Sequence, residues 1–298
     1  MTRQEFSVKP AYFYSRGSRI SADLYRPNGS GPMPAVVVCH GFGSIRKYWV
    51  NEIAAELAAR GFAALIFDYR GFGDSEGRRD QLFPMDQVED TRAALGFLAA
   101  QDDIDPDRLA LYGVSFGGAV AAYAAALDDR AAATVCAVGI ADGRSWLRSL
   151  RRQWEWLEFE KRLAEDRRRR VLTGESEVVD PGEIMIRDPE SIELAARLDA
   201  EYPERAYRLS LESADAIAEF RPIDVVDRIA PRAILFVGVE GDRLTPSEQT
   251  IELFEKARDP KDLIMLRGVT HHDVYQPERR SDLIDRAAAF YLEHLDET

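Results

Sequence analysis

The sequence predicts an α/β protein in which helices cover both faces of a mostly parallel sheet. Two observations support this prediction. Short uninterrupted apolar runs, typical of strands buried on both faces, recur along the chain and alternate with helical patterns. Before them, residues 5–27 alternate apolar and polar positions, which is typical of an antiparallel meander with turns at Lys9-Pro10 and at 16–18. The 298 residues, of which 46% are hydrophobic, allow one large domain with an insertion.

The strand–helix alternation begins at residue 35 and can be followed element by element. Apolar runs predict strands at 35–39, 63–67, 109–112 and 133–140, with a turn at 105–108. Apolar residues at helical spacing predict helices at 50–60, 86–100 and 116–126. After an interruption, the same reasoning predicts strands at 233–239 and 263–266 and helices at 247–257 and 281–295.

Residues 142–222 interrupt this alternation, because they are charged, helical in pattern and without a convincing strand. We therefore expect a core domain of residues 1–141 and 223–298, with a helical cap at 142–222 inserted after the sixth core strand. The cap carries Trp146 and Trp154, which either pack it onto the core or line a substrate pocket together with Trp49. Some of its arginines, those at 151, 152 and 167–170, either form a solvated face or attract an anionic substrate.

Composition excludes several classes of function. With 39 basic and 52 acidic residues, the net charge of −13 disfavours nucleic-acid binding. No apolar run approaches the ~18 residues of a membrane helix, and residues 1–10 lack an apolar signal region. We expect a cytoplasmic protein without a membrane partner. The sequence is rich in Ala and Arg and poor in Lys, which indicates a bacterial genome. Cys39 and Cys136 lie in predicted strands without metal-ligand spacing, so we expect core residues and no metal.

A serine stands at the junction between a predicted strand and a predicted helix, in Gly113-Val114-Ser115-Phe116-Gly117. In this context the G-x-S-x-G pattern predicts a sharp turn that lifts the Ser115 hydroxyl to a helix N-terminus. The alternative is an ordinary serine in a glycine-rich turn. The stretch His40-Gly41-Phe42-Gly43 follows another strand, and its glycines allow close approach of the backbone to an oxyanion. We expect the N–H groups of Phe42 and Phe116 to form the oxyanion hole and His40 to hold the loop.

A serine nucleophile requires a base and a carboxylate that orients the base. His271 and His272 follow the strand at 263–266, and we favour His271 as the base with His272 as the alternative. Asp242 follows the strand at 233–239 and suits the carboxylate role. Glu240 and Asp142 also follow predicted strands and are the competing carboxylates.

The chain order Ser115, Asp242, His271 resembles that of the α/β-hydrolase superfamily, and the resemblance covers nearly the whole chain outside 142–222. Residues 68–75 are similar to a segment of the superfamily that is usually structural. Residues 270–275, Thr-His-His-Asp-Val-Tyr, are similar to the T-H-F-D-x-Y ending of dienelactone-hydrolase-like and bacterial peptidase-like members. In that pattern the first histidine is the base, and an aromatic residue is common where this chain has His272.

The resemblance implies a serine hydrolase with a lid. A dienelactone hydrolase would carry a cysteine nucleophile, and haloalkane dehalogenases and epoxide hydrolases an aspartate, so Ser115 argues against these activities.

The sequence therefore predicts an enzyme that cleaves a carboxylic ester of a small-molecule acyl substrate through an acyl-enzyme, with no cofactor. The same residues can cleave an amide or a C–C bond, or transfer the acyl group to an alcohol. A non-catalytic binding protein on the same scaffold is the alternative from another class. The cap also offers a surface for a homodimer.

Overall fold

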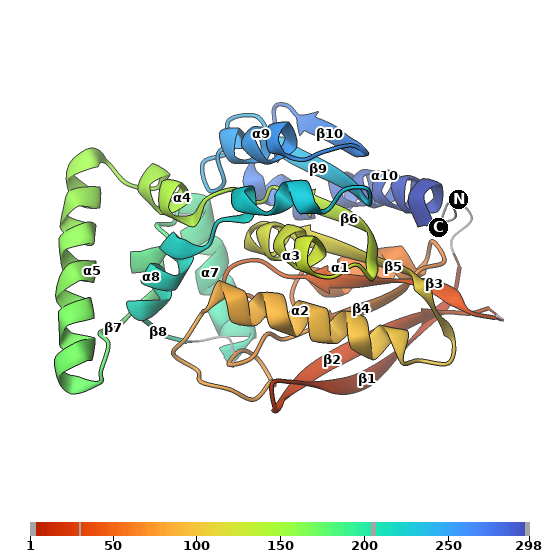
Figure 1. The fold of residues 1–298 in the computed structure, drawn as a ribbon, viewed down its shortest axis with the longest axis horizontal. Coiled ribbons are helices and arrows are strands. Elements are labelled where there is room, and N and C mark those ends of the chain that lie inside the picture. The colour runs from red at the N-terminus through yellow and green to blue at the C-terminus, as the bar shows by residue number, and fades with distance from the viewer. Residues whose placement is uncertain (1–3, 30, 204–206, 296–298) are drawn as a thin grey trace.

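The computed structural model describes residues 4–29, 31–203 and 207–295. Its centre is an eight-stranded sheet in the order β1-β2-β4-β3-β5-β6-β9-β10 (Figure 1). The pairs from β4 to β10 are parallel, whereas β2 is antiparallel to both β1 and β4. The strands are β1 (Phe6–Ser15), β2 (Ser18–Pro27), β3 (Met33–Cys39), β4 (Ala63–Phe67), β5 (Ile104–Val114), β6 (Ala131–Ala137), β9 (Ala233–Val239) and β10 (Lys261–Leu266).

Two hydrophobic cores lie on opposite faces of this sheet. In β3, Ala35, Val37 and Cys39 contribute to one core, and Val36 and Val38 to the other. The first core is covered by helices α2 (Pro84–Ala99), α3 (Phe116–Leu127) and α9 (Ser247–Lys256), and the second by α1 (Val50–Ala58) and α10 (Pro277–Leu295). Because both faces are buried, the central strands read as continuous apolar runs. The predicted α/β fold with a mostly parallel sheet is confirmed.

The N-terminal meander is a single hairpin. The predicted turn at Lys9-Pro10 is wrong, because β1 continues through Pro10, which pairs with Asp23 of β2. β1 is an edge strand, and an edge strand tolerates proline because no outer neighbour requires its missing N–H. The real turn is at Arg16 and Gly17, whose φ values of 48° and 85° suit a two-residue hairpin turn.

The predicted turn at 105–108 lies inside β5. The pairing of β3 with β5 passes from Met33↔Ile104 to Ala35↔Leu109, so these four residues bulge out of the ladder. β5 then continues without interruption to Val114, directly before the candidate nucleophile. The bulge shows why turn residues such as Pro106 appear within a strand segment.

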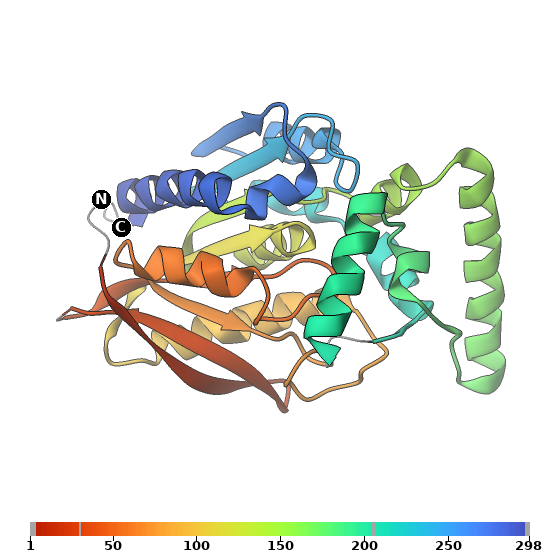
Figure 2. The same cartoon turned by 180° about the vertical axis from the view of Figure 1, so that it is seen from behind.

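The 142–222 segment lies at one end of the sheet, and α5 forms its outer edge in both views (Figures 1 and 2). Its helices are α4 (Gly143–Ser149), α5 (Gln153–Thr173), α6 (Pro181–Ile184), α7 (Pro189–Glu201) and α8 (Glu212–Glu219). The strands β7 (Val178–Val179) and β8 (Leu209–Ser210) were not predicted, because they are too short to show a periodicity. Within the described ranges, no helix has the length and apolar character that crossing a membrane requires.

Candidate active site

Ser115 occupies the turn between β5 and α3 in a strained conformation, with φ 57° and ψ −132°. Positive φ is unfavourable for a residue with a side chain and is a feature of nucleophile turns. The Ser115 N–H donates to the Ala137 carbonyl at 2.9 Å, and the Gly118 N–H donates to the Ser115 carbonyl at 2.8 Å. These bonds hold the side chain at the N-terminus of α3, where the backbone N–H groups have no partners within the helix.

Two positions beside Ser115 must be glycine, because a side chain at either would overlap neighbouring backbone atoms. A Cβ at Gly117 would overlap the carbonyl oxygens of Cys39 and His40, and a Cβ at Gly113 would overlap the carbonyl of Gly117. The turn therefore brings strand and helix backbones together more closely than any side chain allows.

The substitution Gly117→Ala is expected to destabilise the protein by about 1–3 kcal/mol, because the added methyl group must displace backbone atoms. Chemical unfolding measures this loss. Gly29→Ala is the matched control, because a Cβ at Gly29 meets no atom within 4 Å. Equal stability of the two variants would contradict the tight packing described for the turn.

His271 bridges Ser115 and Asp242. Its Nε2 lies 3.1 Å from the Ser115 Oγ, and its Nδ1 lies 2.7 Å from the Asp242 Oδ2. His271 begins the short 3₁₀ helix His271–Tyr275, which follows β10 and is capped by Thr270 and Asp273. Asp242 follows β9, so the carboxyl ends of three parallel strands bring the three residues together.

The Asp242 carboxylate is held by backbone and side-chain donors. Its Oδ1 accepts the N–H groups of Leu244 at 2.8 Å and Thr245 at 2.9 Å, and its Oδ2 accepts the Thr245 hydroxyl at 3.0 Å. Burial acts to raise the pKa of Asp242, but the hydrogen bond and charge of His271 and these N–H groups outweigh it, so the pKa is lowered. Asp242 therefore stays ionised at neutral pH.

The competing carboxylates lie elsewhere. Asp142 caps α4 through the Ser145 N–H and pairs with Arg221. Glu240 pairs with Arg267 at 3.2 Å, where both side chains are exposed. Both carboxylates therefore have structural contacts of their own, and neither is among the partners of His271.

His272 lies beside His271 but faces α7. Its Nε2 lies 2.9 Å from the Ser191 Oγ, and its Nδ1 has no hydrogen-bond partner among the described residues. Burial and the neighbouring His271 lower the pKa of His272 to about 4, although the Asp188 charge partly opposes this. His272 is therefore neutral at pH 7. The imidazole that hydrogen-bonds the Ser115 hydroxyl is that of His271.

His272 is expected to make stability depend on pH. A histidine in an unfolded chain has a pKa of about 6.5, so the unfolded chain binds more protons than the folded one between pH 6.5 and about 4. The contribution of His272 to stability is then lost as the pH falls through this window, by at most about 1.4 kcal/mol per pH unit. Urea unfolding at several pH values measures this slope. His272→Phe should flatten it, and parallel profiles for the two proteins would contradict the lowered pKa.

The loop after β3 passes directly over Ser115. A Cβ at Gly41 would lie 3.2 Å from the Ser115 Cβ and 3.5 Å from its Oγ, so this backbone packs against the serine. Phe42 follows Gly41, and Phe116 is the first residue of α3. Both N–H groups therefore belong to backbone segments next to Ser115, as the oxyanion-hole prediction requires.

Buried polar groups stabilise the loop that follows β3. Asp68 is fully buried, accepts the N–H groups of Arg46 at 2.7 Å and Asp74 at 3.0 Å, and pairs with the Arg46 guanidinium. The His40 Nδ1 lies 3.0 Å from the Gly41 carbonyl oxygen. Burial lowers the pKa of His40, which keeps it neutral within the loop. Asp68 and His40 thus have structural contacts.

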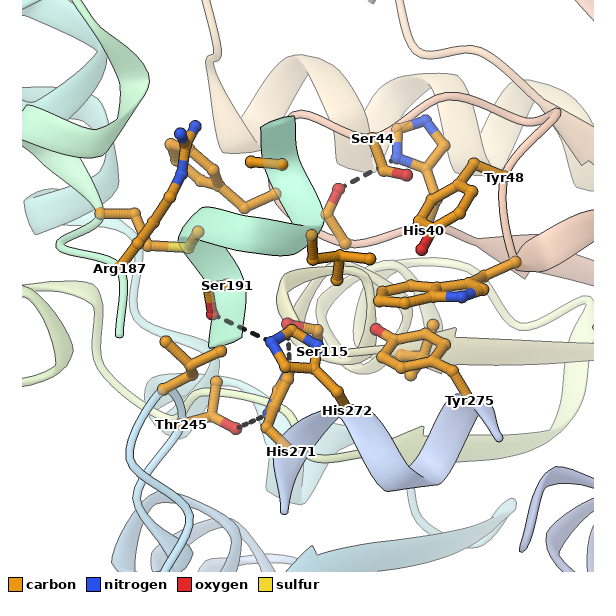
Figure 3. Close-up of a pocket in the computed structure, with 18 of the residues that line it drawn as sticks. His40, Ser44, Tyr48, Ser115, Arg187, Ser191, Thr245, His271, His272 and Tyr275 are labelled. Atoms are coloured by element: carbon orange, nitrogen blue, oxygen red, sulfur yellow. Dashed lines mark hydrogen bonds between the residues drawn. The ribbon is translucent and has the colours of Figure 1, made fainter. Parts of the chain in front are cut away.

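Ser115 lines a cavity between the core and α7 (Figure 3). Trp49 and Trp146 also line it: Trp49 stacks on Tyr275 with ring centroids 3.8 Å apart, and Trp146 donates its indole N–H to the Leu244 carbonyl at 2.6 Å. Apolar side chains form much of the remaining wall, including Val50, Val114, Met185, Leu194, Ala195, Leu198 and Leu244.

The pocket prediction is wrong for Trp154, which is 55% exposed and does not line this cavity. It lies on the outward face of α5, whereas Trp156 and Phe159 lie on the buried face. The spacing of the apolar residues predicted the helix, but it did not identify the face that is buried.

The cavity residues that could not be identified from the sequence include Tyr275, Ser191 and Arg187. Tyr275 is buried and lines the cavity beside Ser115, and burial raises its pKa far above the usual range. Its place at the end of the Thr-His-His-Asp-Val-Tyr stretch was the signal that could have identified it. Ser191 and Arg187 lie in the charged 142–222 segment, which offers no such pattern.

The two cysteines are core residues. Burial raises the pKa of the Cys39 thiol to about 11 and that of Cys136 to about 12, so both stay protonated. In the part of the chain that the structure describes, no group of three or more His, Cys, Asp or Glu side chains is placed to hold a metal ion.

Comparison with known proteins identifies the family. Residues 16–273 match the model of the X-Pro dipeptidyl-peptidase (S15 family). This match covers most of the chain, so the chain belongs to the S15 family and is an α/β-hydrolase enzyme. The resemblance predicted from the sequence is confirmed at this level.

Relatives named as a thiohydrolase and as a polyketide transferase match most of the chain. A thiohydrolase of Eupenicillium brefeldianum is 26% identical over 81% of this chain and 80% of its own. The polyketide transferase grgF of Penicillium sp is 27% identical over 88% of each chain. The crystal structure of the alpha/beta hydrolase GrgF from Penicillium sp. sh18 matches with a TM-score of 0.82 at 24% identity, covering 97% of this chain and 99% of its own, which shows the shared fold.

A third relative is similar over a shorter stretch. The quorum-quenching protein AidA of Acinetobacter baumannii (strain MDR-ZJ06) is 41% identical over 134 residues, which are 45% of this chain and 44% of its own.

Proposed function

We propose that this S15-family member is a serine esterase that cleaves a carboxylic ester through an acyl-enzyme on Ser115. One observation carries the proposal: the side chains of Ser115, His271 and Asp242 form an unbroken hydrogen-bonded chain, with distances of 3.1 and 2.7 Å. A serine hydroxyl is a weak nucleophile, and a neighbouring imidazole held by a carboxylate is the arrangement that activates it.

In the proposed reaction, the Ser115 Oγ attacks the ester carbonyl while the His271 Nε2 takes its proton. Asp242 holds the Nδ1–H and stabilises the imidazolium that forms. The N–H groups of Phe42 and Phe116 receive the negative charge of the tetrahedral intermediate. His271 then gives its proton to the leaving alcohol, and the Ser115 acyl ester remains. Water, deprotonated by His271, attacks this ester, and return of the proton to Ser115 releases the acid.

A thioester is the second candidate substrate, because two relatives are named as a thiohydrolase and a polyketide transferase. The same acyl-enzyme serves both, since a thiol leaves in place of the alcohol. Transfer differs from hydrolysis only in which nucleophile, an alcohol or water, attacks the acyl-enzyme.

The family name describes a different activity, the release of X-Pro dipeptides, and the cavity does not favour it. Such a peptide carries a cationic amino terminus, which requires a carboxylate or similar acceptors. The described lining residues of the cavity include no Asp or Glu, and they do include Arg187. A neutral or anionic acyl compound suits this lining better than a cationic peptide.

We further propose that residues 142–222 act as the cap of the site. The supporting observation is that Ser191, Leu194 and Leu198 of α7 line the cavity that contains Ser115. A cap of this kind shields the acyl-enzyme from bulk water and selects the substrate.

Stopped-flow kinetics with p-nitrophenyl esters of increasing acyl length test the proposal. We expect a burst of nitrophenol equal to the enzyme concentration, followed by slower turnover as the acyl-enzyme is hydrolysed. Added methanol should raise the steady-state rate only if deacylation limits that rate and the alcohol can reach the acyl-enzyme in the cavity. Folded protein that gives neither a burst nor turnover with any ester or thioester would contradict the proposal.

A further inference from the structure

One charged side chain lines the cavity among the residues that the structure describes, that of Arg187. The other lining groups are apolar, aromatic, hydroxyl or imidazole groups. Arg187 is half-buried in the short connection between α6 and α7. Over the described ranges, its guanidinium forms no ion pair, whereas Arg162, Arg167 and Arg170 of α5 do.

Several of the arginines that the sequence offered as anion-binding candidates have structural contacts instead. Arg167 and Arg170 both pair with Asp215 and so join α5 to α8. Arg151 donates to the carbonyl oxygens of Leu147, Glu183 and Ile184 at 2.8, 2.6 and 2.8 Å. Among the described lining residues of the cavity, Arg187 is present, whereas none of the arginines at 151, 152 and 167–170 is.

The position of Arg187 gives the cavity two chemically different ends. In Figure 3, Arg187 lies on one side of the view and Tyr275 on the other, with Ser191 and Ser115 between them. The Tyr275 end is aromatic, because this ring stacks on Trp49. A substrate whose carbonyl reaches Ser115 can therefore extend toward the aromatic pair and toward the cation.

A guanidinium at an apolar wall has lost part of its hydration without gaining a counter-ion, so an anion placed there forms strong hydrogen bonds. Its planar fork matches a carboxylate with two parallel N–H···O bonds. A phosphate dianion would require further cations, and the described lining residues include no lysine and no second arginine. The chemistry of this end thus fits a single carboxylate.

We propose that Arg187 binds a carboxylate that the substrate carries away from its scissile ester. The inference rests on the proposed esterase function and specifies its substrate class: half-esters of dicarboxylic acids, or esters of hydroxy acids. Such a substrate differs from that of an X-Pro dipeptidyl-peptidase, whose recognised charge is the positive amino terminus of a peptide.

Two pairs of nearly isosteric esters test this proposal. On the acyl side, the p-nitrophenyl half-ester of glutaric acid is compared with its terminal primary amide. On the alcohol side, 3-butanoyloxypropanoate is compared with 3-butanoyloxypropanamide. The measured quantity is the ratio of kcat/KM for the charged ester to that for the neutral ester. We expect a ratio of about 10 to 100 in at least one pair, the usual effect of a charged hydrogen bond.

The ratio is expected to fall to about 1 in Arg187→Gln and to lie between these values in Arg187→Lys, which keeps the charge but loses the fork. Arg168→Gln is the matched control, because it removes the same charge from the exposed surface of α5 and should preserve the ratio. A ratio near 1 in the unmodified enzyme for both pairs overturns the inference, as does a ratio that survives in both Arg187 variants.

Ser115→Ala separates the two proposals. If it abolishes hydrolysis of all four esters while the ratio is insensitive to Arg187, only the carboxylate site is wrong. If Ser115→Ala still hydrolyses the esters, the proposed function fails first.

Discussion

Ser115→Ala is expected to lower kcat for ester hydrolysis by about 10⁶-fold, the effect found when a triad nucleophile is removed. The variant has no oxygen that can attack the carbonyl, and His271 then has no hydroxyl proton to accept. Alanine retains the Cβ and the backbone bonds to Ala137 and Gly118, so the fold is expected to persist. Initial rates with a p-nitrophenyl ester, together with circular dichroism and thermal unfolding, measure both expectations.

Ser191→Ala is the matched control for this experiment. It also removes a cavity hydroxyl beside an imidazole, that of His272 at 2.9 Å, but Ser191 has no role in the proposed chemistry. We expect its rate to stay within about tenfold of the unmodified enzyme, the scale of losing one supporting hydrogen bond. A folded Ser115→Ala protein with nearly full activity would contradict the assignment of the nucleophile.

Asp242→Asn is expected to lower kcat by about 10⁴-fold, and the contacts of Asp242 give the reason. Its Oδ1 accepts two backbone N–H groups, from Leu244 and Thr245, so the amide oxygen of an asparagine takes that position. The amide NH₂ then faces the His271 Nδ1, where Oδ2 now lies. An NH₂ group donates, so Nδ1 must become the acceptor and Nε2 carries the proton. In that tautomer His271 cannot take a proton from Ser115.

Rates and ¹⁵N chemical shifts of the His271 ring measure this effect, because the shifts distinguish the two tautomers. Asp142→Asn provides the control, since Asp142 also follows a core strand but caps α4 and pairs with Arg221. We expect the control to affect stability and to leave the His271 tautomer unchanged. A larger loss of rate in Asp142→Asn than in Asp242→Asn would mean that the wrong carboxylate has been assigned.

The central strands and the strand-end residues could be predicted from the sequence because their signals are local. A strand buried on both faces leaves no polar positions, so 63–67 and 233–239 were bounded correctly. The Ser115 turn was recognisable because Gly113 and Gly117 have no room for a side chain. The positions after β9 and β10 then followed from a general property of parallel sheets, whose functional residues gather at one edge.

The features that sequence analysis missed depend on tertiary contacts. Pro10 was read as a turn because its tolerance within β1 depends on the lack of an outer neighbour. Trp154 was assigned to the pocket because helical spacing does not reveal which face packs inward. Arg187 resembles any other arginine in a charged segment, and the finding that it has no ion pair among the described residues emerges only once the acidic side chains have been placed.

An organophosphate that labels the nucleophile covalently locates it in the chain. Diethyl p-nitrophenyl phosphate should inactivate the enzyme with release of one nitrophenol per chain, since an activated serine attacks phosphorus as it attacks a carbonyl. Peptide mass spectrometry should then find the diethylphosphoryl group on Ser115, with labelling abolished in Ser115→Ala and much slower in Asp242→Asn. A phosphoryl group on any other residue of the inactivated enzyme would contradict the mechanism.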